Sequence, residues 1–167
     1  GHTIRNMKVR GCTNSSLYGA GFIGDINGAV TVKDIAFDGA DVFFVNYAKP
    51  QFAGNVGGVV LGYTYGTTLF ENVSVTNSSI WGFGILLGMG ADPGVKVTFK
   101  DCVSKNNTIH AAYDMGGLAG MIQRGNGVDN ASVENCTVEN ITVDYYEECV
   151  DVQGKATLKE NDKNGAD

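Results

Sequence analysis

The stretch ASVENCTVENITV, residues 131–143, alternates apolar side chains with small or charged ones and carries asparagines at positions 135 and 140. Alternation with a period of two is typical of a β-strand that buries one face. Asparagine adopts positive φ more cheaply than most residues other than glycine, and its amide bonds nearby backbone. The segment therefore predicts short strands separated by corners.

Four other segments match this pattern without gaps, at residues 4–14, 32–42, 70–80 and 99–109, so the copies start at 4, 32, 70, 99 and 133. The second position of each copy is always charged. Two corner positions recur, the third as Asn6, Asp34, Asn72, Asp101 and Asn135, and the eighth as Gly11, Gly39, Asn77, Asn106 and Asn140. A variable spacing between constant units is typical of coils joined by loops of different length, which indicates a solenoid.

Strand, corner and strand, returning after about 30 residues, describe one coil of a parallel β-helix. We therefore predict an all-β fold, a right-handed parallel β-helix of about five rungs, as a single domain over residues 1–158 with a polar tail at 159–167. Equivalent side chains should then stack as ladders about 4.8 Å apart. Residues 152–158 are expected to form a degenerate capping strand. Because no Gly-rich half-coil precedes the first copy, we expect the chain to be a piece of a longer solenoid.

The other half of each coil is rich in glycine, as in GGVVLGY at 57–63 and GFGILLGMG at 82–90. We expect these glycines where the backbone turns or where neighbouring rungs approach closely. A phosphate-binding loop would need a GK[ST] ending or a GxGxxG entering a helix, and neither is present. The sequence thus predicts no nucleotide or other cofactor.

GGLAG at 116–120, followed by VENC at 133–136, resembles the GLUG-type repeat found in tandem in bacterial surface and secreted proteins, including adhesin-like chains. The resemblance covers most of residues 4–143, and the other copies match it less closely. It implies a β-helix in an exported, cell-envelope or secreted setting, accessory to another activity, with further domains flanking the repeat. It does not imply catalysis by the repeat itself.

Charge and cysteine usage narrow the expected partners. A net charge of −6 and an isoelectric point near 4.8 disfavour nucleic acid and anionic lipid, and the longest apolar stretches are far shorter than the roughly 20 residues that span a bilayer. Cys102 and Cys136 share one column, where we favour free buried thiols over a disulfide. Cys12 and Cys149 lie at opposite ends, and no Cys/His cluster predicts zinc.

The twelfth position of three consecutive copies holds Phe43, Trp81 and His110. If the alternation continues, these rings face outward in a row, a flat platform for a sugar chain or a protein partner. Three further aromatic residues, Tyr63, Tyr65 and Tyr113, are candidates to lie nearby. The alternative is that loops of the longer rungs fold over the row and bury it.

Carboxylates near one another, Asp38 with Asp41 and Glu147 with Glu148 and Asp151, could bind calcium or act as the acid and base of a glycosidase or lyase, but solvated acidic loops are favoured. Seven N-x-[ST] triplets follow mainly from the asparagine corners. We predict a non-catalytic, surface-exposed adhesion or binding module for a glycan or a cell-surface protein, outside a bacterial cell. The alternatives are an accessory part of a carbohydrate-active β-helix enzyme and a pure spacer.

Overall fold

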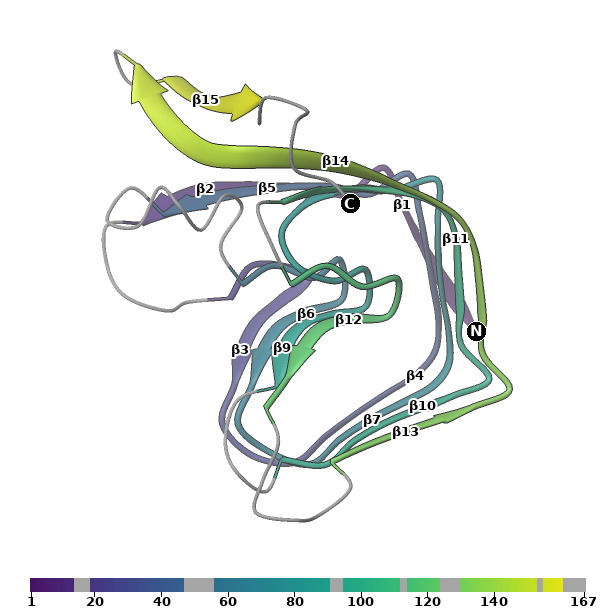
Figure 1. Ribbon diagram of the computed structural model, residues 1–167. Helices are drawn as coiled ribbons and strands as arrows, with labels where there is room; N and C mark the ends of the chain where they lie inside the picture. Colours follow the sequence, from purple (N-terminus) through teal and green to yellow (C-terminus); the bar gives the residue numbers. More distant parts are fainter. Residues whose placement is uncertain are drawn as a thin grey trace, which may run out of the picture.

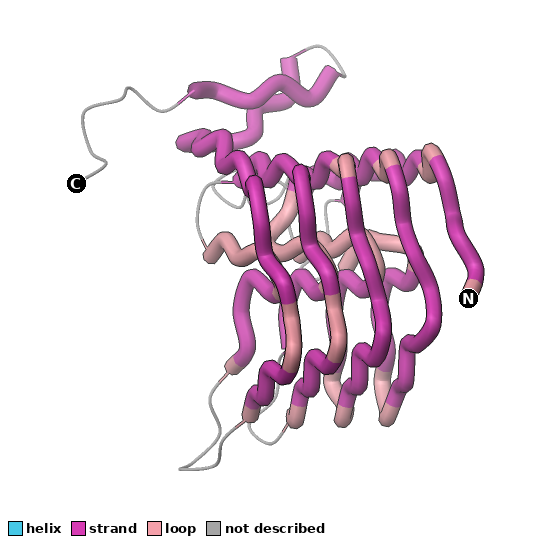
Figure 2. The backbone as a smooth tube through the Cα atoms, turned by 90° about the vertical axis from the view of Figure 1, so that its right-hand side faces the viewer, coloured by secondary structure: helices cyan, strands magenta, loops and turns pink. Residues whose placement is uncertain are grey.

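The computed structural model describes residues 1–13, 19–46, 56–90, 95–111, 114–123, 130–152 and 155–160. All regular structure in these ranges is β-strand. Seen along its axis, the chain winds so that each coil lies on the previous one (Figure 1), and from the side the coils run as parallel tubes (Figure 2). Every pairing between consecutive coils is parallel. The predicted parallel β-helix is confirmed.

The strands follow one another in the same order on each turn. They are β1 (His2–Arg5), β2 (Lys8–Thr13), β3 (Ile23–Ile26), β4 (Val30–Asp38), β5 (Asp41–Asn46), β6 (Leu61–Thr64), β7 (Thr68–Thr76), β8 (Ser79–Trp81), β9 (Leu87–Gly90), β10 (Val97–Lys100), β11 (Val103–Ala111), β12 (Ala119–Ile122), β13 (Ala131–Glu134), β14 (Thr137–Val152) and β15 (Lys155–Glu160).

The number of complete turns is smaller than the predicted number of rungs. The Gly-rich face is a sheet of four strands, β3, β6, β9 and β12, so three full turns separate its first strand from its last. The face opposite has five levels, in the order β1, β4, β7, β11 and β14. The coil thus makes about three complete turns, with a partial turn at each end.

Each coil bends at two left-handed corners. The first corner is formed by Asp34, Asn72, Asp101 and Asn135, with φ between 50 and 54°, and the second by Asn6, Gly39, Asn77, Asn106 and Asn140, with φ between 51 and 66°. Side-chain amides bond from one coil to the next at both corners: Asn72 Nδ2 donates to Asp34 Oδ1 at 2.9 Å, and Asn140 Nδ2 donates to Asn106 Oδ1 at 3.1 Å. The asparagine ladders are confirmed.

The first copy lies in a different register from the one predicted. Ile4 pairs with Phe37 rather than with Val32, and Asn6 therefore belongs to the second corner, beside Gly39, not to the first. Asparagine occurs at both corners, so the residue type alone does not show to which of the two corners Asn6 belongs. The apolar residues that continue the columns decide the register, because Val9 pairs with the fully buried Val42.

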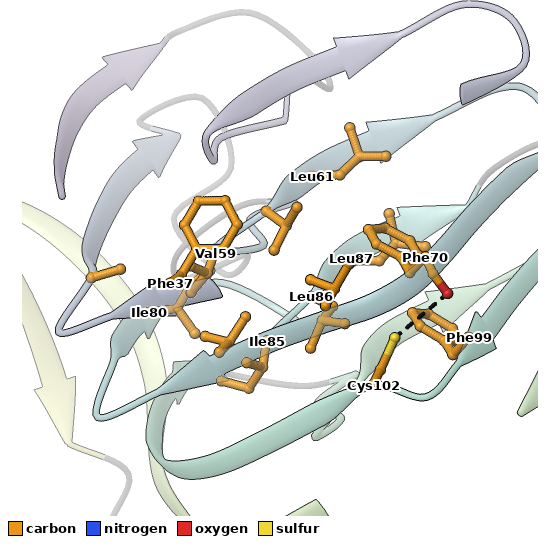
Figure 3. Packing of buried hydrophobic residues seen from close by; sticks show 14 of the residues in the cluster. Phe37, Val59, Leu61, Phe70, Ile80, Ile85, Leu86, Leu87, Phe99 and Cys102 are labelled. Carbon is orange, nitrogen blue, oxygen red and sulfur yellow. Dashed lines mark hydrogen bonds between the residues drawn. The ribbon is translucent and has the colours of Figure 1, made fainter. Parts of the chain in front are cut away.

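The core is a stack of equivalent side chains inside the coil (Figure 3). Phe70 and Phe99 stack with ring centroids 5.1 Å apart and planes inclined by 6°. The buried thiol of Cys102 lies 3.5 Å from the carbonyl oxygen of Phe70, and burial raises the pKa of this thiol to about 11. Cys102 and Cys136 are both free, as predicted, but Cys136 is partly exposed rather than buried.

Two buried polar side chains, Asn107 and Ser78, link three coils beside the second corner. Asn107 donates to the carbonyl oxygen of Val75 at 2.9 Å and accepts from the backbone N–H of Ser78 at 2.9 Å. The Ser78 hydroxyl in turn accepts from the N–H of Ala40 at 3.0 Å. Buried polar groups that are fully bonded favour a single register, because a slip would leave them unsatisfied.

Close backbone approach explains the glycines, as predicted. A Cβ atom on Gly58 would lie 2.3 Å from the carbonyl oxygen of Leu61 and 2.7 Å from the nitrogen of Gly88 on the next coil. One on Gly62 would lie 2.4 Å from the nitrogen of Ala20 on the previous coil. Any larger residue would push neighbouring coils apart on this face.

The C-terminal end departs from the predicted capping strand. Beyond Tyr145, β14 leaves the stack and pairs antiparallel with β15, over residues 146–160 (Figure 2). The hairpin is therefore no additional rung. Residues 161–167, most of the predicted tail, lie outside the described residues.

We expect Asn106→Ala to lower the free energy of unfolding by about 1–3 kcal/mol, because alanine at positive φ is strained and the ladder loses bonds to both neighbouring coils. Asn106→Gly keeps the conformation and should lose less. Denaturant unfolding followed by circular dichroism measures both. Equal stability of the alanine variant and the native chain would contradict the corner's role.

Candidate functional site

Five outward side chains stack in register on β2, β5, β8, β11 and β14. They are Arg10, Phe43, Trp81, His110 and Asp144, one from each level, and we call them the Trp81 column. They point outward because the residue before Phe43, Trp81 and His110 in each strand is a fully buried core residue: Val42, Ile80 and Ile109. The three rings predicted to share a column do so.

The rings touch, but they do not form a flat stripe. Phe43 and Trp81 meet edge to face, with centroids 4.5 Å apart and planes at 65°, and Trp81 and His110 are 5.2 Å apart and tilted by 35°. All three side chains are partly buried. The predicted row of rings is therefore not a flat platform, because each ring packs on the edge or oblique face of its neighbour. The indole is held on both sides, so it is preorganised with part of its surface open.

A guanidinium closes the N-terminal end of the column. Arg10 Cζ lies 5.9 Å from the centroid of the Phe43 ring, within the range of a cation–π interaction. The same side chain pairs with the carboxylate of Asp41 and donates to the Asp41 carbonyl oxygen at 3.0 Å. Arg10 stays half exposed, so it retains the capacity to bind an anion or a hydroxyl group.

At the other end, His110 lies between a hydroxyl and a carboxylate. Its Nε2 is 3.2 Å from Ser79 Oγ, and its Nδ1 is 3.2 Å from Asp144 Oδ2. Burial lowers the pKa of His110, and the carboxylates of Asp144 and Asp41 oppose this effect without reversing it. The imidazole is thus held neutral at physiological pH, in contact with the 46% exposed Asp144 side chain.

Ser79, His110 and Asp144 have the order of groups that activates a serine nucleophile. The hydroxyl faces Nε2, and the carboxylate faces Nδ1. Such a nucleophile also needs donors for the developing oxyanion. The nearby backbone N–H groups of Ser79 and Gly82 already donate to the carbonyl oxygens of Ala40 and His110, at 2.8 and 3.2 Å. The arrangement can orient a hydroxyl, but these two amides do not complete a catalytic site.

The two predicted tyrosines that the structure describes, Tyr63 and Tyr65, belong to another part of the molecule. Tyr63 lies on the Gly-rich face, 4% exposed, in a second apolar cluster with Val56, Phe83 and Met89. Tyr65 is 41% exposed and packs against Tyr63, with ring centroids 4.5 Å apart. Tyr113 lies outside the described residues. Tyr63 and Tyr65 therefore do not extend the Trp81 column, whose residues belong to the other sheet.

The predicted carboxylate pairs do not form an acid–base site where their side chains are described. Asp38 accepts from Asn77 and Thr76, whose hydrogen bonds lower its pKa, whereas Asp41 pairs with Arg10. Glu147, Glu148 and Asp151 lie in the part of β14 that forms the hairpin with β15, and their side chains are not among those that the structure describes. No group of three or more metal-binding side chains gathers in the described ranges.

Sequence reasoning missed three residues of this region, Arg10, Ser79 and Asp144. Asp144 occupies the twelfth position of the fifth copy, so the alignment that found Trp81 contained the signal for it. Arg10 was hidden by the wrong register of the first copy. Ser79 reaches His110 diagonally, from two residues before Trp81 on the neighbouring level, which no column alignment displays.

Comparisons with protein-family models, curated proteins and solved structures find no match for the chain. In the part of the chain with a described backbone, no helix has the length and apolar character needed to cross a membrane. Function must be inferred from the geometry of the Trp81 column.

Because burial lowers the pKa of His110, we expect its NMR titration midpoint below 6.5, and Asp144→Asn should lower that midpoint further by removing a carboxylate that favours the charged ring. His110 contributes stability above its unfolded pKa, and this contribution is lost as the pH falls through the lower folded pKa.

The titration is read from the imidazole protons and from the fluorescence of the single tryptophan, Trp81, with His110→Gln as the control that removes the transition. A midpoint at or above 6.5 would contradict the burial of the ring. A midpoint that rises in Asp144→Asn would contradict the role of the carboxylate.

Proposed function

We propose that this domain is a non-catalytic binding module that holds a glycan chain against the Trp81 column. One observation carries the proposal: the rings of Phe43, Trp81 and His110 are in contact on the outer surface of three consecutive levels, and none is fully buried. Rings locked by their neighbours lose little freedom on binding, which favours affinity.

The chemistry of the column suits a carbohydrate. The apolar C–H faces of sugar rings pack on aromatic side chains, while hydroxyl groups require polar partners at the edges. Arg10 and Asp144 supply such partners at the two ends, 50% and 46% exposed. Parallel strands are spaced by about 4.8 Å, comparable with the length of one sugar residue, so a linear glycan running along the column could place one sugar on each level.

The setting proposed for this module is the outside of a bacterial cell, secreted or on the envelope, as part of a chain with further domains. The resemblance of GGLAG and VENC to the GLUG-type repeat supports this setting. The net charge of −6 supports neutral or partly cationic ligands over nucleic acid. In such an adhesion protein, this domain would bind the glycan and the neighbouring domains would anchor the chain to the cell.

We expect Trp81→Ala to weaken glycan binding about tenfold, because the central ring supplies stacking contact to the ligand and positions both neighbours. A glycan array identifies a ligand, and calorimetry with that ligand measures the loss. Tyr65→Ala is the matched control, because it removes an exposed ring from the Gly-rich face and should leave affinity unchanged. Equal losses in the two variants, or an array without any bound glycan, would reject the column as a carbohydrate site.

A second candidate function, hydrolysis of an acyl ester, is favoured by the arrangement of Ser79, His110 and Asp144. The binding proposal expects a fluorophosphonate probe to leave Ser79 unlabelled, because the adjacent backbone amides are already bonded. Mass spectrometry of the native chain, Ser79→Ala and Ser74→Ala decides between the two. Labelling of the native chain and Ser74→Ala, but not of Ser79→Ala, would establish the nucleophile and overturn the non-catalytic assignment.

A further inference from the structure

Both ends of the stack present edge strands on the same side of the coil. In the described part of the chain, β1 and β2 at the N-terminal end pair only with β4 and β5. Residues 137–145 of β14, at the C-terminal end, pair only with β11. Each edge therefore leaves one row of backbone N–H and C=O groups able to pair with another strand.

The C-terminal edge exposes side chains that belong to core columns. Val138 and Val143 are 49% and 48% exposed. Val143 continues the column of Ile109 and Ile80, which are fully buried, and Val138 continues that of the buried Ser104. These valines are exposed because no strand of the described stack covers them.

The two edges carry charges of opposite sign. One outward column begins with Arg5 and ends with Glu139, and the Trp81 column begins with Arg10 and ends with Asp144. The guanidinium groups lie on the N-terminal edge and the carboxylates on the C-terminal edge. All four side chains are between 46% and 69% exposed, so each retains room for a further partner.

We propose that β1 and β2 of a second copy of this chain dock on the β14 edge of the first, head to tail. With the register of the existing coils, Arg5 of the second copy would lie beside Glu139 and its Arg10 beside Asp144. Asn6 of the second copy would extend the asparagine ladder at Asn140. Ile4 and Val9 would cover Val138 and Val143, as Phe37 and Val42 are covered within the chain.

Self-complementarity favours a second copy over an unrelated partner. Two charged columns, one corner ladder and two apolar columns all match between opposite ends of the same chain in a single register. Contact between two different surfaces of one molecule is heterologous, so it adds copies one after another rather than closing a dimer. The Trp81 column would then continue from one copy into the next, with the Asp144 and Arg10 side chains meeting at the junction.

The test is sedimentation velocity over a range of concentrations in low and high salt. We expect the native chain to form dimers and longer species, less so when salt rises from about 50 mM to about 500 mM, because the paired charges are exposed. One variant reverses the N-terminal edge (Arg5→Glu with Arg10→Glu), and another reverses the C-terminal edge (Glu139→Arg with Asp144→Arg). Each alone should weaken self-association at least about tenfold.

Mixing the two reversed variants should restore association, because each reversed edge then meets an edge of opposite charge. Val138→Lys should weaken association, because it places a charge in the proposed apolar contact. Ser74→Lys is the matched control: Ser74 points outward in the middle of the stack, so this variant should associate like the native chain. Circular dichroism confirms that each variant is folded. A native chain that stays monomeric at every concentration in low salt, or reversed variants whose mixture does not associate, would overturn the proposal.

Discussion

The coil closes because the chain enters the left-handed region of backbone conformation at the same two places on every turn. For residues other than glycine this region carries a conformational cost, and asparagine and aspartate bear it best because their short side chains bond locally. Here those side chains also bond to the neighbouring coil, as Asn72 does with Asp34 and Asn140 with Asn106. The residue that permits the bend is thus the one that aligns each coil with the next.

That alignment also builds the candidate site. Register fixed at the corners brings the twelfth positions of the second to fifth copies onto one line with Arg10, and three of these five residues have rings. No loop or cleft is needed to bring Phe43, Trp81 and His110 together, because stacking alone does so. The same register places Arg10 at one end of the line and Asp144 at the other, which gives the surface a direction from cation to anion.

The corner and core columns of the second to fifth copies could be predicted, because equivalent positions of successive repeats lie next to one another in a stacked coil. The register of the first copy could not, since asparagine is suited to both corners and only the apolar columns distinguish them. The line of rings was predictable for the same reason as the core. Its tilts were not, because χ angles depend on packing between neighbours, and the proximity of Ser79 to His110 depends on a diagonal that residue columns do not encode.

Parallel stacking also governs how such a chain reaches its native state. Within the stack, a strand pairs with a strand one coil away, 26–38 residues along the chain. Few contacts are therefore local, and each new turn must close a long loop before it gains any bonds. Two adjacent coils are the smallest unit that buries apolar side chains. Once such a pair exists, its open edge serves as the template for the following coil, and elongation should outpace initiation.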